Sequence, residues 1–236
     1  EISECLVGSE MCIRDSYHKG MNGIIQELTG LLKKKNIGTD SDRALLLDFQ
    51  ATLEIKPEKA IKLEKDALAQ IENITADNAR LVSNLHANLG GLYRMNGHPD
   101  LAREHMEKSI SLLDQFNLLH INDSIPQIAN YAMFLTEQQE PERGISELQK
   151  LSGIIKEYHS DDCLDYAKVQ ETLATIYLMT ANLPQAKTHF KRAFKIYEKI
   201  WADEPEMIEA KYQEIQELYP QIGFCIGKNL SGLLTK

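Results

Sequence analysis

The side chains whose spacing can indicate catalysis or metal binding are histidine, cysteine and serine. His98 and His105 lie seven residues apart, and the sequence contains no His-Glu-x-x-His pair. The dipeptide Gly90-Gly91 lies within a helical pattern, where close packing explains it better than a phosphate-binding loop. No serine or cysteine lies in a nucleophile motif. We therefore expect a protein that is not an enzyme, with no catalytic residues, no bound metal and no cofactor.

The four cysteines are scattered along the chain. Cys5, Cys12, Cys163 and Cys225 show no metal-ligand spacing. We expect Cys163 and Cys225 to be reduced thiols, because disulfides form mainly in oxidising compartments and no secretory signal is recognisable. This favours an intracellular, cytoplasmic location.

The segment 5–16 (CLVGSEMCIRDS) has neither a helical nor a strand period and matches nothing downstream. It resembles a translated transposase adapter from a sequencing library. We therefore expect residues 1–16 to be an adapter-derived artefact with no fold of their own, and the native N-terminus to be missing. Cys5 and Cys12 would then have no function.

The charge of the chain argues against two kinds of partner. With 35 acidic and 26 basic residues the formal net charge is −9, whereas binding to nucleic-acid phosphates requires clustered lysine and arginine. No stretch approaches the roughly 20 apolar residues that a membrane-spanning helix requires. We expect neither a nucleic-acid nor a membrane partner.

A 42-residue period organises most of the chain. Small residues recur at this spacing: Ala60, Ala102, Gly144 and Ala186. A proline precedes each of them by two or three residues: Pro57, Pro99, Pro141 and Pro184. Because proline fits the first turn of a helix, where its missing N–H has no intrahelical partner, each proline predicts the start of the second helix of a repeat.

The preceding segment of each repeat shows the same period. Large residues occupy one position: Leu47, Leu89, Tyr131 and Leu173. A second set lies four residues later: Ala51, Tyr93, Leu135 and Tyr177. A small residue follows the first set in three repeats, at Gly90, Ala132 and Ala174, whereas Asp48 interrupts this pattern in the first repeat. This spacing predicts a first helix that packs closely on the second.

The second repeat reads Leu89-Gly90-x-x-Tyr93-x-x-x-Gly97-x-x-x-x-Ala102-x-x-x-Met106. This pattern resembles the tetratricopeptide repeat, and the 42-residue spacing is similar to that of kinesin light chain repeats. HEAT repeats share the period but do not explain the small and aromatic positions. The predicted boundaries are a remnant second helix at 17–40, four repeats at 41–82, 83–124, 125–166 and 167–208, and a C-terminal capping helix and tail at 209–236.

The resemblance implies an all-α fold, a superhelical array of antiparallel helical hairpins whose first helices line a concave groove. It also assigns groove positions that contact a partner: Asn84, Asn88, Arg94, Asn130, Met133, Lys168, Glu171 and Thr175. The smaller residues Ala87, Gly91, Ala129 and Thr172 share this face. Asn88 and Asn130 occupy the same repeat position, where a carboxamide can pair with a partner's backbone. His86 falls where the family has an apolar or aromatic residue, so we expect it to be packed rather than to bind a ligand.

The resemblance implies a protein-interaction scaffold that binds a peptide or helix of another protein in the groove. The clamp pattern of chaperone-binding members is absent, so a chaperone tail is not the expected ligand. An alternative is a regulatory or sensor domain of a larger signalling protein or enzyme, whose effector part lies upstream. The sequence leaves the partner's identity and the oligomeric state open.

Overall fold

The computed structural model describes residues 38–122 and 124–218, together with the helical residues 20, 23, 24, 27 and 30. All regular structure in this part of the chain is α-helical, which confirms the predicted all-α fold class. The expected artefact at 1–16, most of the expected remnant helix at 17–40 and the expected tail beyond residue 218 lie outside the described residues.

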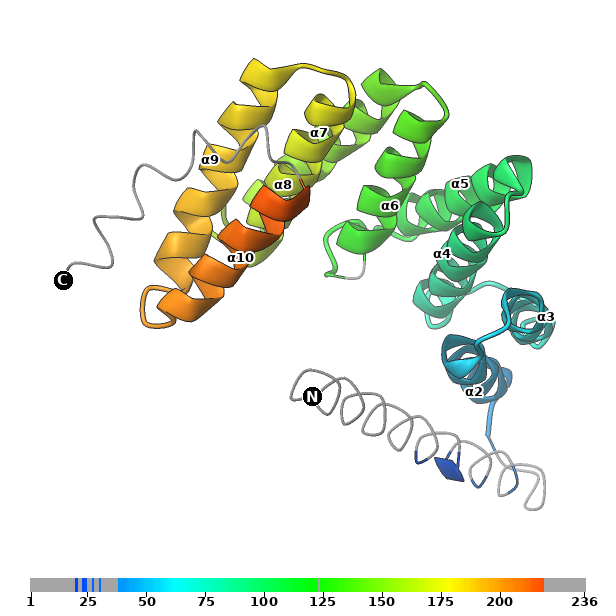
Figure 1. Ribbon diagram of the computed structural model, residues 1–236. Coiled ribbons are helices and arrows are strands. Elements are labelled where there is room, and N and C mark those ends of the chain that lie inside the picture. The colour runs from blue at the N-terminus through cyan, green and yellow to red at the C-terminus, as the bar shows by residue number, and fades with distance from the viewer. Residues whose placement is uncertain are drawn as a thin grey trace, which may run out of the picture. The chain divides into compact units, whose positions relative to one another are not determined.

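The chain divides after Leu118 into two compact parts, which we call the N-terminal and C-terminal modules. The N-terminal module contains two helical hairpins. Its four helices are α2 (Asp40–Leu53), α3 (Pro57–Leu68), α4 (Ala79–Met95) and α5 (Pro99–Gln115). Helix α2 packs on α3 and α4 on α5, and α4 also packs against both helices of the first hairpin (Figure 1).

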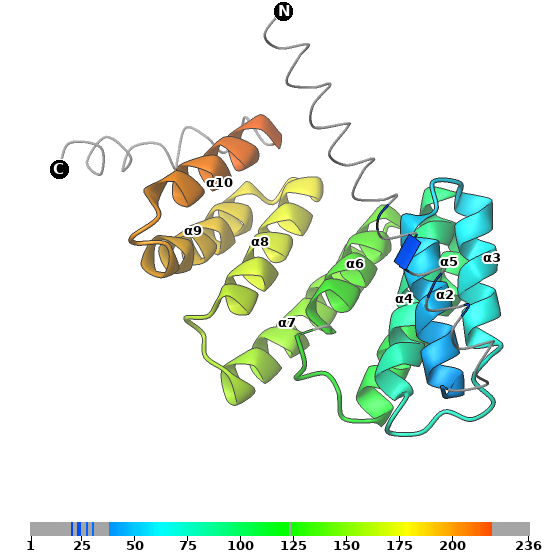
Figure 2. The ribbon, with the colours of Figure 1, turned by 90° about the horizontal axis from the view of Figure 1, so that it is seen from below.

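The C-terminal module contains two further hairpins and a single helix. Its five helices are α6 (Ser124–Glu137), α7 (Pro141–Tyr158), α8 (Leu164–Met179), α9 (Leu183–Ile200) and α10 (Pro205–Leu218). Helices α6 and α7 form one hairpin and α8 and α9 the other, and α8 packs against both helices of the preceding hairpin. Figure 2 shows α10 lying alongside α9, beyond the last complete hairpin.

The hairpin turns explain why the helices stop at regular intervals. Each hairpin is joined by three residues, and the second helix begins at its proline or, in α9, one residue before it. In three of the four turns the middle residue has a left-handed backbone conformation: Gly97 (φ 75°), Gln139 (φ 64°) and Ala181 (φ 58°). The next N–H then bonds back to a carbonyl five residues earlier, as His98 does to Tyr93 at 2.9 Å, which ends the first helix.

The first helices begin slightly earlier than the period predicts. The expected repeats and capping segment begin at residues 41, 83, 125, 167 and 209. The helices begin at Asp40, Ala79, Ser124, Leu164 and Pro205. The period fixes the spacing of equivalent residues, but the start of each helix depends on the length of the preceding loop.

The hairpins are held by close approach of their two helices. The four periodic small residues, Ala60, Ala102, Gly144 and Ala186, are all buried. At Gly144 of α7 an added Cβ would lie 2.6 Å from the carbonyl oxygen of Ala132 in α6 and 3.2 Å from its Cα. Because these are backbone atoms, the two helices would have to move apart to admit a methyl group. This explains why the third repeat has glycine where the others have alanine.

Replacement of Gly144 by alanine tests this packing. We expect Gly144→Ala to destabilise the C-terminal module by about 1–3 kcal/mol through overpacking. Gly153 provides a matched control on the same helix, because an added Cβ there meets nothing within 4 Å. Gly153→Ala should raise stability by about 0.5–1 kcal/mol through helix propensity. Urea unfolding of both variants measures the two effects, and a stabilised Gly144→Ala protein would contradict the close approach.

Candidate partner-binding groove

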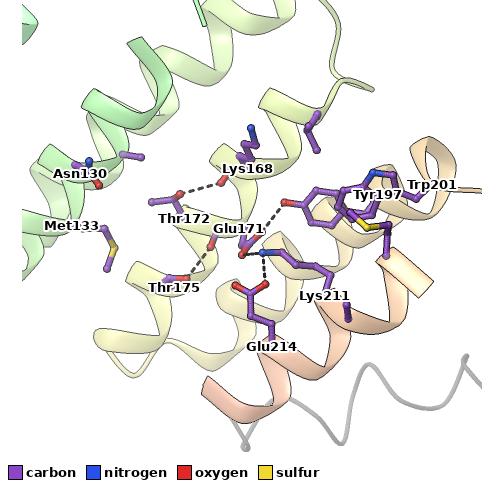
Figure 3. A pocket seen from close by; sticks show the side chains of 14 residues that line it. Asn130, Met133, Lys168, Glu171, Thr172, Thr175, Tyr197, Trp201, Lys211 and Glu214 are labelled. Atoms are coloured by element: carbon purple, nitrogen blue, oxygen red, sulfur yellow. Dashed lines mark hydrogen bonds and ion pairs between the residues drawn. The ribbon is translucent and has the colours of Figure 1, made fainter. Parts of the chain in front are cut away.

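A cavity of about 610 Å³ lies in the C-terminal module between α6, α8, α9 and α10 (Figure 3). Five of the eight groove residues predicted from the sequence line it: Asn130, Met133, Lys168, Glu171 and Thr175. Ala129 and Thr172, from the same predicted face, line it as well. The structure therefore brings together the predicted residues of α6 and α8.

The other walls of the cavity come from α9 and α10, which the sequence analysis did not assign to the groove. Tyr197 lies on α9, the second helix of its hairpin, and Trp201 is the residue that caps the C-terminus of α9, whereas the predicted groove positions all lie on first helices. The α10 residues are Met207, Ala210, Lys211 and Glu214. Trp201 is the only tryptophan of the chain, and this was the sequence signal that could have indicated a binding surface.

An aromatic pair forms one wall of the cavity. The rings of Tyr197 and Trp201 stack with centroids 4.8 Å apart and an interplanar angle of 11°. Tyr197 is 2% exposed, whereas Trp201 is half-buried and Met207 is 46% exposed. The buried tyrosine thus supports a tryptophan face whose apolar surface remains accessible to a ligand.

An ionic network joins α8 to α9 and α10 across the cavity. The Tyr197 hydroxyl donates a 2.6 Å hydrogen bond to Glu171 Oε2, and Lys211 Nζ lies 2.8 Å from Glu171 Oε1. Lys211 Nζ also lies 3.0 Å from Glu214 Oε2 (Figure 3). Burial by itself lowers the pKa of Lys211, but the hydrogen bonds and charges of both glutamates outweigh this and raise it. Glu171 is therefore engaged in positioning α10 as well as lining the cavity.

The remaining polar side chains of the cavity differ in what they offer a ligand. The hydroxyls of Thr172 and Thr175 donate to the carbonyls of Lys168 and Glu171, at 3.0 and 3.1 Å, so their oxygens remain as acceptors. The Lys168 side chain is 55% exposed, and its ammonium lies 3.8 Å from Asp165. Asn130 is exposed on α6. Asn130 and Lys168 therefore supply the accessible hydrogen-bond donors.

The other three predicted groove residues lie in the N-terminal module. Asn88 Nδ2 donates to Asp48 Oδ1 at 2.8 Å and to Glu64 Oε1 at 3.2 Å, so both of its amide hydrogens bind within its own module. Asn84 and Arg94 are half-buried on α4. The shared repeat position of Asn88 and Asn130 therefore does not give them the same surroundings.

Two apolar residues of α2 occupy groove positions that the sequence analysis left unassigned. Leu45 and Phe49 lie 84 residues before Ala129 and Met133, two repeat periods away. Both are accessible, at 40% and 45% exposure. The N-terminal module thus presents apolar side chains at the repeat positions that are equivalent to the cavity-lining positions of the C-terminal module.

His86 and His105 adjoin a second cavity, of about 500 Å³, in the N-terminal module. Their Nδ1 atoms are 2.8 Å apart and their ring centroids 5.1 Å apart, which places the two nitrogens almost on the line between the rings. One imidazole therefore donates its N–H to the other. Burial, followed by the charges of His105 and Lys108, lowers the pKa of His86 to about 4, which favours a neutral pair at pH 7. Within the described ranges, no group of three or more His, Cys, Asp or Glu side chains is arranged to hold a metal ion.

The comparisons with known proteins agree with this architecture. A tetratricopeptide repeat family model matches residues 124–199. The crystal structure of BtubC (BKLC) from P. vanneervenii is 19% identical with a TM-score of 0.65, and the match covers 77% of this chain and 72% of that one. A crystal structure of putative kinesin light chain TPR-like repeats from Podosopora anserina is 16% identical with a TM-score of 0.59, covering 78% of this chain and 95% of that one.

A third structure, that of MamA, is 15% identical with a TM-score of 0.52, and the match covers 77% of this chain and 91% of that one. At these identities the similarity concerns the fold. No curated protein matches this sequence.

Antiparallel hairpins with small residues at their crossings define an all-α solenoid of the helical-repeat class. The tetratricopeptide repeat match at residues 124–199 lies within this array, and the fold of the chain is similar to that of the kinesin light chain TPR-like repeats. Among the helices that the structure describes, none is both long and apolar enough to cross a membrane.

Removal of the Lys211 ammonium tests the network that positions α10. We expect Lys211→Met to lower stability by about 1–3 kcal/mol, because it leaves the largely buried Glu171 carboxylate with only the Tyr197 hydroxyl. Trp201 fluorescence during urea unfolding reports on the cavity wall directly. Lys199→Met is the matched control, since Lys199 pairs with Asp162 on the surface with 63% and 55% exposure. Its effect should be small, and equal losses in the two variants would contradict the role given to Lys211.

Proposed function

We propose that the C-terminal module binds a peptide or helical segment of a partner protein in the cavity between α6, α8, α9 and α10. Tetratricopeptide repeats form scaffolds generally used for protein interaction, and the fold is typically non-enzymatic. The observation that supports this site is the convergence of the predicted groove residues of α6 and α8 with the Tyr197–Trp201 pair in one cavity.

The size and lining of the cavity suit a few side chains of an inserted segment. Its volume of about 610 Å³ lies within the range of roughly 300–1,000 Å³ of ligand pockets. Trp201, Met133 and Met207 offer apolar surface for an anchoring side chain. Asn130 can pair with the partner's backbone through both its N–H and its C=O. Lys168 can pair with a carboxylate.

Selection of binding peptides from a random display library on the full chain tests this proposal. For the peptides recovered, we expect Asn130→Ala and Lys168→Ala each to weaken binding by about tenfold, measured by fluorescence anisotropy, because each removes a hydrogen-bonding group from the cavity. Trp201 fluorescence should also change on binding.

Two exposed residues outside the cavity provide matched controls for these variants. Gln149 on α7 is an exposed carboxamide, and Lys191 on α9 an exposed ammonium. Gln149→Ala and Lys191→Ala should bind the same peptides with unchanged affinity. Peptides that bind all four variants equally would show that the cavity is not the binding site.

A further inference from the structure

In the first hairpin, a pair of acids occupies two positions that hold a small residue and a large apolar residue in every other hairpin. One member of the contact is the small residue of the first helix: Gly90, Ala132 and Ala174. The other is a large apolar residue of the second helix, 16 positions later: Met106, Leu148 and Phe190. In the second hairpin the two touch, since a Cβ on Gly90 would lie 2.6 Å from Met106 Cγ. One period earlier, the same positions hold Asp48 and Glu64.

Glu64 is deeply buried at this position. It is 1% exposed, and its Oε2 atom has no hydrogen-bond partner among the described residues. Asn88 of α4 donates one bond to Asp48 and one to Glu64 Oε1, as described above. An ionised carboxylate buried beside a second carboxylate and without a cation is costly, whereas a carboxylic acid can donate to its neighbour. The orphaned oxygen therefore identifies where a proton belongs.

We propose that Glu64 carries a proton at neutral pH and donates it to Asp48, forming a joint between α2, α3 and α4 that weakens when the proton is lost. Each of the three helices contributes one side chain to this joint. Loss of the proton would leave two adjacent carboxylates in the packing between the first hairpin and α4. The proton therefore controls how firmly α2 and α3 are held, and it also fixes Asn88, a predicted groove residue. The inference does not depend on the proposed binding function.

The groups around Glu64 favour its protonated form. Burial, followed by the negative charge of Asp48, raises the pKa of Glu64 to about 9. Burial also raises the pKa of Asp48, although its hydrogen bonds with Glu64 and Asn88 oppose this shift. From α2 the facing group is Asp48, and from α4 it is the uncharged Asn88. Among the described residues, no cationic side chain contributes to either shift.

The direction of the pH dependence follows from the proton count. Between the ordinary glutamate pKa of 4.5 and about 9, the folded state holds a proton that the unfolded state has lost. Unfolding therefore releases a proton, and the folded state becomes less stable as the pH rises through this range. A window of pH 7–9 lies above the ordinary histidine pKa of 6.5, so protonation of His86 and His105 contributes little to the slope, and because the pKa of each is lowered in the folded state its contribution has the opposite sign.

The test uses the full chain with glutamate labelled at the side-chain carboxyl carbon. The Glu64 carboxyl resonance, assigned by its absence in Glu64→Gln, should titrate well above pH 7. In urea unfolding followed by circular dichroism, the unfolding equilibrium constant should rise with pH between 7 and 9, approaching tenfold per unit at most. Glu64→Gln should remove this slope, because the glutamine N–H can donate to Asp48 without a titratable proton. Glu58→Gln, at an exposed position of the same helix, should retain the slope.

Three results would overturn the proposal. One is a Glu64 resonance that titrates at the ordinary glutamate pKa in the wild-type chain, a measurement that requires no variant to fold stably. Another is a slope between pH 7 and 9 that persists in Glu64→Gln. The third is stabilisation by added Mg²⁺ or Ca²⁺ at pH 8 that Glu64→Gln abolishes, since this would show that a cation rather than a proton occupies the joint.

Discussion

The close approach of two helices within a hairpin is the constraint on which the rest of this structure depends. A backbone carbonyl oxygen of α6 lies only 2.6 Å from the place that a Cβ of residue 144 would take, so glycine alone fits this position without displacing a helix. Alanine stands at the equivalent position in the other hairpins, as at Ala102 and Ala186, which are both fully buried. Because the helices lie this close, their large side chains are directed into the spaces between hairpins, where they form the core of each module.

This packing also determines which side chains remain available for a ligand. In the C-terminal module, the first helices α6 and α8 bury their large periodic residues, so Asn130, Met133 and Lys168 face the cavity instead. Helix α10 adds a wall that a hairpin array alone would lack. The Glu171–Lys211 pair and the Tyr197 hydroxyl connect that wall to α8 and α9, so stability and the shape of the cavity depend on the same side chains.

The first hairpin shows how the same crossing can be built differently. Asp48 and Glu64 stand where the second hairpin has Gly90 and Met106, and Asn88 of α4 donates a hydrogen bond to each of them. An acid pair of this kind makes the packing between α2, α3 and α4 depend on a proton, whereas the corresponding contact in the second hairpin does not titrate. The departure from the repeat pattern at Asp48 therefore replaces an apolar contact between helices with a titratable polar one.

The sequence alone determined the helical hairpins, because proline and small residues at a 42-residue spacing act through local backbone geometry and helix contact, both of which repeat along the chain. It also identified the α6 and α8 faces of the cavity. It could not show that Trp201 and Lys211 complete the site, or that Asn88 is bound by Asp48 and Glu64. Those relations join residues from different helices, and only tertiary packing decides which side chains meet and how deeply their charges are buried.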